Sequence, residues 1–272
     1  MKIMAKAGRH LRGSRATGAA AVVIGALVAM ASAPAAAQWL NYPTAGIPRL
    51  PNGKPNMAAP TPRKPNGQPD LSGIWEPNGL KYLINIAADL RPEDVPFQPW
   101  AAAVYKERLE NFGKDDPNAK CLPSGIPEKD AVTSPFKIVE IPGEVIILYE
   151  SRTIFRQIFT DGRPFPTDPQ PAWQGYSIGK WEGDTFAVET IGFNNNNWLD
   201  TNGHPVTDAL HVTERFTRKD FGHMQIQITI DDPKAYTKPW TVTENPHLLA
   251  DTELIESICE ENNKDPQHIV GK

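Results

Sequence analysis

The fold is decided by the stretch from Gly175 to Thr190, which reads GYSIGKWEGDTFAVET. Apolar and polar side chains alternate on both sides of a Glu-Gly-Asp turn, and a period of two is that of β-strands. The same alternation, broken by Gly and Asp turns, extends from Lys137 to Thr243. We expect strands at Gly73–Glu76, Lys137–Ile141, Val145–Tyr149, Thr153–Thr160, Gly175–Trp181, Thr185–Thr190, His211–Thr217, Met224–Ile230 and Trp240–Thr243.

Many short strands at close spacing predict a mainly β fold, an antiparallel up-and-down β-barrel with one short helix. The helix is expected from Pro99 to Phe112, where Ala101, Val104, Tyr105, Leu109 and Phe112 fall on one stripe. Residues 38–69 are rich in proline and should form an extended arm, because such a composition cannot build a core. Residues 70–272 then form a single barrel domain.

The first 37 residues have the pattern of a cleaved secretory signal peptide. A basic segment precedes an apolar stretch of about thirteen residues, too short for the ~20 that span a bilayer, and small residues follow at 34–37. We therefore expect a periplasmic or secreted protein without a stable membrane anchor. Loss of this basic segment makes the formal charge of −4 more negative, so the chain has no electrostatic attraction for nucleic acid.

Cys121 and Cys259 are the two cysteines. In an oxidising compartment two cysteines indicate one disulfide, although a thiolate nucleophile is the alternative.

Two charged side chains interrupt apolar strand faces. Period two places Arg156 between Ile154 and Ile158, and it places Glu214 between Val212 and Phe216. A buried ion is costly unless it is paired, so Arg156 and Glu214 are natural partners. A structural ion pair and the polar end of a ligand cavity both remain open at this point.

The loop from Gly192 to His204 is polar, contains four consecutive asparagines, and is either a ligand-binding loop or a plain mobile one. Candidate ligand-binding residues in and around it are Trp173, Tyr176, Trp181, Asn196, Trp198 and His204. Asp200, His204 and His211 lack the spacing of a metal site, so no metal is expected. The sequence also lacks a phosphate loop, a nucleophile elbow, H-E-x-x-H and C-x-x-C, which leaves chemistry without a cofactor.

Several motifs extend over residues 70–263: DLSGIW at 70–75, DGR at 161–163, GYSIGKWEGDT at 175–185, ERF at 214–216, DDPKAYTKPW at 231–240 and CEENN at 259–263. Their combination resembles a large family of exported proteins from acidobacteria and proteobacteria, most of them without an assigned function. Gly73-Ile74-Trp75 also resembles the G-x-W opening of lipocalin-type (calycin-like) barrels. In those barrels the Trp pairs with an Arg near the end of the chain, and the last arginine here is Arg218.

We expect an exported barrel enzyme that performs acid–base chemistry, as a lyase, hydratase or isomerase, on a small hydrophobic or phenolic molecule. Glu214 would accept a proton, Arg156 would stabilise negative charge, and His211 or Tyr149 would return the proton. A periplasmic carrier for a small lipophile and a structural envelope module are the alternatives.

Overall fold

A computed structural model describes residues 43–259 and 261, so the expected signal peptide lies outside the described residues. Ten strands form one sheet: β1 (Gly73–Glu76), β2 (Phe136–Ile141), β3 (Glu144–Tyr149), β4 (Ile154–Phe159), β5 (Tyr176–Glu182), β6 (Thr185–Ile191), β7 (His211–Arg218), β8 (Met224–Asp231), β9 (Trp240–Glu244) and β10 (His247–Leu249). The helices are α2 (Lys81–Ile84), α3 (Pro99–Glu110) and α4 (Glu128–Ala131), with short 3₁₀ turns at Pro92–Asp94 and Pro117–Lys120. The chain is therefore mainly β, as its alternation predicts.

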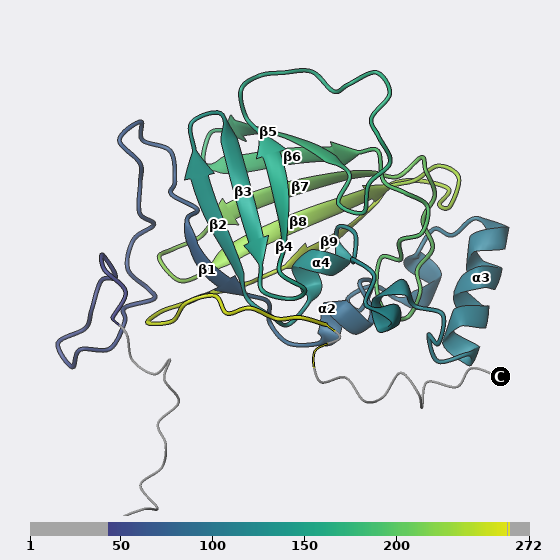
Figure 1. Ribbon diagram of the computed structural model, residues 1–272, viewed down its shortest axis with the longest axis horizontal. Helices are drawn as coiled ribbons and strands as arrows, with labels where there is room; N and C mark the ends of the chain where they lie inside the picture. The colour runs from purple at the N-terminus through teal and green to yellow at the C-terminus, as the bar shows by residue number, and fades with distance from the viewer. Residues whose placement is uncertain (1–42, 260, 262–272) are drawn as a thin grey trace, which may run out of the picture. The chain divides into compact units, whose positions relative to one another are not determined.

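The strands follow the order β10-β1-β2-β3-β4-β5-β6-β7-β8-β9 (Figure 1). All neighbours are antiparallel except β4 and β5, which pair in parallel over only two residue pairs. The expectation of a wholly antiparallel sheet is wrong at this seam. The long connection at 160–175 carries the chain back along the sheet, so β5 starts in the same direction as β4.

The sheet curls so that its two ends share one chain segment. The β8–β9 ladder continues past β9 to a bridge between His223 and His247, and His247 is also the first residue of β10, which pairs with β1. Residues 240–249 thus contact β8 along one edge and β1 along the other. The result is a barrel-like sheet whose inner face carries the core.

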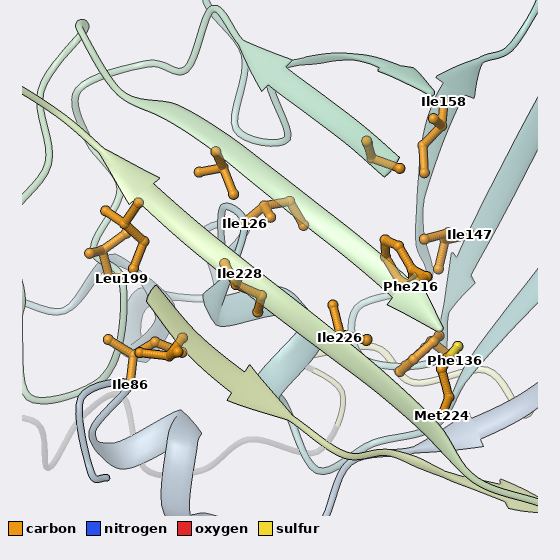
Figure 2. Packing of buried hydrophobic residues seen from close by; sticks show 14 of the residues in the cluster. Ile86, Ile126, Phe136, Ile147, Ile158, Leu199, Phe216, Met224, Ile226 and Ile228 are labelled. Carbon is orange, nitrogen blue, oxygen red and sulfur yellow. The ribbon is translucent and has the colours of Figure 1, made fainter. Parts of the chain in front are cut away.

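The core consists of aliphatic and aromatic side chains from alternate positions of the strands. Figure 2 shows Ile158, Ile147 and Phe216 from different strands directed towards the same interior as Ile226 and Ile228 of β8. Burial of such side chains is the main favourable contribution to folding, at ~1.5–3 kcal/mol each.

Helix α3 occupies the expected region, but its apolar stripe does not face the core. Only Ala101 is buried in this helix, while Leu109 is 41% exposed. Phe112 lies beyond the helix end with φ of 54° and is 96% exposed, so the expected boundary was two residues too long.

The proline-rich segment is not a loose arm. It contains a repeat that sequence inspection missed, PRLPNGKPN at 48–56 and PRKPNGQPD at 62–70. Each copy forms a tight loop in which the arginine bridges to a proline six residues later and donates to the glycine carbonyl of its own loop. Arg49 then forms a fork with Asp251, and Arg63 forms one with Asp184.

The segment between the two loops packs on the barrel. Ala59 is buried, and the carbonyls of Met57 and Ala59 accept hydrogen bonds from Gly222 and Phe221. The expected arm at 38–69 thus differs from the structure over the described residues 43–69, because the two loops satisfy their own polar groups while Ala59 joins the core and Met57 packs against it.

Candidate functional site

The structure confirms that Arg156 and Glu214 form a pair inside the sheet. Nη1 of Arg156 donates to Oε1 of Glu214 at 3.0 Å, and Nη2 donates to Oε2. Nη2 also donates to Thr190 of β6 at 2.8 Å, and Nε donates to Ser177 of β5 at 3.1 Å. The guanidinium of β4 therefore crosses the weak β4–β5 seam and reaches three further strands, which replaces part of the missing backbone pairing.

Two further polar residues join this pair. Tyr149 of β3 donates its hydroxyl hydrogen to Oδ1 of Asp130 at 2.7 Å, and Oδ2 of Asp130 lies 3.8 Å from Nη1 of Arg156. Asp130 belongs to α4, which lies beside β4 in Figure 1. We call Asp130, Tyr149, Arg156 and Glu214 the interior cluster.

The interior cluster lies in a dry environment, and this perturbs its acids. Burial, followed by the charge of Glu214, raises the pKa of Asp130 to about 8. Burial, with the charge of Asp130, also raises the pKa of Tyr149 well above its usual value. For Arg156 burial favours the neutral form, but Glu214 outweighs it by Coulomb attraction and hydrogen bonding, so the pKa of Arg156 rises. Asp130 is thus a carboxyl group that changes its charge near neutral pH.

A third carboxyl group, Glu244 at the end of β9, faces the same interior. Its pKa lies well above its usual value because of burial and the charges of Asp130 and Glu214. Oε1 of Glu244 and Oδ2 of Asp130 are both buried without a hydrogen-bond partner. Unpartnered buried oxygens are uncommon and mark places where a proton or a bound group completes the structure.

Asp130 and Glu244 were missed by sequence reasoning. Asp130 lies in a segment, residues 124–132, whose nine residues are all buried although it contains Glu128, Lys129 and Asp130 in succession. We call residues 124–132 the plug segment. Three consecutive charges usually indicate a solvated surface, so only the tertiary structure reveals the plug. Glu244 was detectable, because it follows Trp240 and Val242 at the same spacing of two residues and therefore points inward as they do.

The plug segment carries further perturbed groups. Burial raises the pKa of Glu128 to about 8 and lowers the pKa of Lys129 to about 7. Lys129 donates to the carbonyl of Ser151 at 2.6 Å, and Asn118 donates to Glu128 at 3.1 Å. These bonds anchor the plug to the β3–β4 hairpin and to the preceding turn.

His211 is not part of the interior cluster. It lies three positions before Glu214 on β7, hence on the opposite face, and its Nε2 is 3.4 Å from Oε2 of Glu189. It therefore has no direct path for a proton to Glu214, whereas Tyr149 does lie in the cluster.

The candidate ligand-binding residues do not gather at one place. Tyr176 packs against Phe159 and Phe165, and Trp181 packs against Phe186 and below Lys64. Trp173 is half-buried and Asn196 is exposed. Trp198 is buried under the guanidinium of Arg108, with 4.1 Å between the ring centroid and Cζ.

His204 forms a separate buried pair with Asp200. Nδ1 of His204 lies 2.6 Å from Oδ2 of Asp200, which also accepts from the amide of Ile86. The ring of His204 stacks on Phe97 and Tyr105. This pair holds the end of the asparagine loop against the segment after α2. Within the described ranges, no group of acidic, histidine or cysteine side chains has the arrangement of a metal site.

Cys121 and Cys259 form the expected disulfide, with Cα atoms 5.7 Å apart. The bond joins the turn just before the plug segment to the C-terminal tail. Ser257 of that tail also exchanges hydrogen bonds with Thr153 of the β3–β4 hairpin. In the part of the chain that the structure describes, no helix is long and apolar enough to cross a membrane.

Neither a scan against protein-family models nor a search of curated proteins finds a match to the chain.

Proposed function

We propose that the chain is an acid–base enzyme, a lyase, hydratase or isomerase that needs no cofactor and acts on a small hydrophobic or phenolic molecule. The observation that carries the proposal is Asp130, a buried carboxyl group with a pKa of about 8 and one oxygen without a partner. General acid–base catalysis is most efficient when the pKa of the catalytic group lies near the working pH.

The roles follow from which hydrogen-bonding groups are already committed. Both oxygens of Glu214 bind Arg156, so we assign Glu214 the role of holding the guanidinium in place and propose Asp130 as the base instead. Asp130 takes or gives the proton, and Glu214 lies within hydrogen-bond reach of its protonated carboxyl group. Arg156 has five N–H groups. Four of them donate to Glu214, Thr190 and Ser177, and the fifth is on Nη1, on the side of Asp130.

Tyr149 is the second proton carrier of the proposed reaction. Its hydroxyl is bonded to Oδ1 of Asp130, so a proton lost by Tyr149 reaches Asp130 without passing through solvent. Nη1 of Arg156 would stabilise the negative charge that develops on a substrate oxygen beside Asp130.

The substrate must pass the plug segment in this proposal. Asp130, Glu214 and Arg156 are each at most 2% exposed, so the interior cluster is closed in this structure. The plug contacts β4 through Asp130, whose Oδ2 lies 3.8 Å from Nη1 of Arg156, and β4 is joined to β5 by only two residue pairs, the weakest backbone pairing of the sheet. We propose that the plug moves away from β4 when substrate enters.

A lipocalin-like relationship and an exported location belong to the same proposal. The guanidinium of Arg218 lies 4.9 Å from the ring of Trp75 and donates to the carbonyls of Asp70 and Ser72, just before β1. This supports the Trp–Arg pairing that the G-x-W resemblance implies, although the arginine comes from β7. The disulfide supports an oxidising compartment such as the periplasm, and the motif resemblance supports the exported bacterial family.

The test compares purified wild-type protein with Asp130→Asn. Incubation with a panel of phenolic and isoprenoid compounds, read by mass spectrometry, should show gain or loss of water or an isomer. Asp130→Asn should lower the rate by about 10²–10⁴-fold. Asp89→Asn, which changes an exposed carboxylate, is the matched control.

A second readout does not depend on knowing the substrate. Infrared difference spectra between pH 6 and pH 9 should contain a protonated-carboxyl band that Asp130→Asn reduces, and the part that remains belongs to Glu128, whose pKa is also raised to about 8. Full turnover by Asp130→Asn, or a wild-type protein without this band, would exclude Asp130 as the acid–base group.

A further inference from the structure

A groove of about 870 Å³ lies on the outer surface of the sheet, away from the interior cluster. Its floor contains one cross-strand row, in which Leu249, Ile74, Lys137 and Leu148 are successive partners on β10, β1, β2 and β3. The neighbouring residue Trp75 points inward and is fully buried. The row therefore belongs to the outer face of the sheet.

The two walls of the groove are tied to each other. One wall is residues 43–47 of the proline-rich segment, and the other is residues 252–254 of the C-terminal tail. Asp251 accepts from the amide of Thr44 at 2.9 Å and from Arg49 at 2.5 and 3.0 Å, and its own amide donates to Oγ1 of Thr44 at 3.0 Å. These bonds give the groove a fixed width.

The lining is aliphatic rather than aromatic. The large apolar side chains along the groove are Ile47, Ile74, Leu148, Leu248, Leu249 and Leu254, with Phe221 as the one large aromatic ring among the lining residues. Leu148 is 38% exposed, so a ligand there removes apolar surface from water. An alkyl chain fits this lining better than a flat ring system does.

One cation in the floor is uncommitted. Within the described residues Lys137 forms no ion pair, whereas Arg218 is bonded to the carbonyls of Asp70 and Ser72. The carboxylate of Asp70 accepts from Ser72, and Glu253 is exposed on the wall. An alkyl chain laid over Lys137 would desolvate its ammonium group, so the ligand must supply the counter-charge.

We infer that this groove binds a free long-chain fatty acid, with its carboxylate on Lys137 and its alkyl chain along Leu148 and Leu254. The site is separate from the proposed acid–base centre, since no residue of the interior cluster lines the groove. It gives the chain a second activity, the capture of an amphiphilic acid on the outside of the barrel-like sheet.

Calorimetric titration with dodecanoate and 1-dodecanol, below the concentration at which they aggregate, tests the inference. Wild-type protein should bind both, the acid about tenfold more tightly. Lys137→Met should remove that tenfold preference and leave the affinity for the alcohol unchanged. Leu148→Asp should weaken both ligands. Lys180→Met, at an exposed lysine paired with Glu182, should change neither.

Three results would overturn the inference. The first is a wild-type protein that binds neither ligand, and the second is an acid preference that survives in Lys137→Met. The third comes from a parallel titration with lipid vesicles: binding only to vesicles that contain anionic lipid would assign the groove to a membrane surface. Melting curves of all three variants check that each is folded, because Lys137, Leu148 and Lys180 are all exposed.

Discussion

Replacing Arg156 should lower the free energy of unfolding more than replacing Glu214 does. Arg156→Met leaves Glu214, which is 0% exposed, as a buried carboxylate without a counter-ion. Loss of one partner of a buried pair costs about 3–5 kcal/mol of the free energy of unfolding. Glu214→Gln leaves a buried guanidinium instead, but Oδ2 of Asp130 is 3.8 Å away and can replace the lost charge.

Asp130 can replace the charge of Glu214 because Glu214 itself is one cause of the raised pKa of Asp130. After burial, the charge of Glu214 is the largest cause that raises this pKa, so Glu214→Gln should lower it and allow Asp130 to ionise beside Arg156. We therefore expect Glu214→Gln to cost only about 1–3 kcal/mol. The double variant should be less destabilised than the sum of the single variants by more than about 1 kcal/mol.

Urea unfolding at pH 7, followed by tryptophan fluorescence, measures all four proteins of this cycle. A cost below about 1 kcal/mol for Arg156→Met would show that Glu214 is hydrated. Additive single costs, within about 0.5 kcal/mol, would show that the two side chains do not interact.

Three further predictions concern the plug segment and its tether. The raised pKa of Asp130, about 8, means that the folded state holds a proton that the unfolded state has lost above pH 4, so the free energy of unfolding should fall as pH rises from about 4 to 8. Glu128, with its pKa also raised to about 8, adds to this fall, and Lys129, with its pKa lowered to about 7, opposes it only above pH 7; urea midpoints at pH 5 and pH 7 give the sign, and Asp130→Asn should reduce the slope without removing it. Gly125→Ala would place Cβ 2.7 Å from Cγ of Asn197 and should cost ~1–3 kcal/mol by calorimetry; an unchanged melting temperature would contradict that contact. Cys121→Ser opens a loop with a sequence separation of 138 and should cost ~4–5 kcal/mol in chain entropy, measured by urea unfolding against the oxidised wild type.

Side-chain alternation predicted nine of the ten described strands, with β10 missed, and it predicted the Arg156–Glu214 pair of the interior cluster. Arg156 and Glu214 break an otherwise apolar period of two, and this local signal implied that they meet across the sheet. The direction of β5 was not predictable in this way, because alternation is the same in parallel and antiparallel strands.

The two buried carboxyl groups that sequence reasoning missed, Asp130 and Glu244, were missed for different reasons. Asp130 lies on a four-residue helix, too short to show a period, and its burial depends on strands that follow it in the chain. Glu244 was lost to a boundary error of one residue, since the strand was expected to end at Thr243. β4 begins one residue later than expected, because Arg152 and Thr153 both have a positive φ, which does not fit a strand.

The duplicated PRxPNGxP loops set an order of assembly. All bonds that shape each loop join residues at most eight apart, so both loops close on the fast timescale of short-range contacts. Asp184 and Asp251, by contrast, reach their final positions only when distant strands have paired. Each loop therefore forms on its own and docks after the barrel-like sheet has formed. Under a pulling force applied at the N-terminal end, the bond of Arg49 to Asp251 should break before the bond of Arg63 to Asp184.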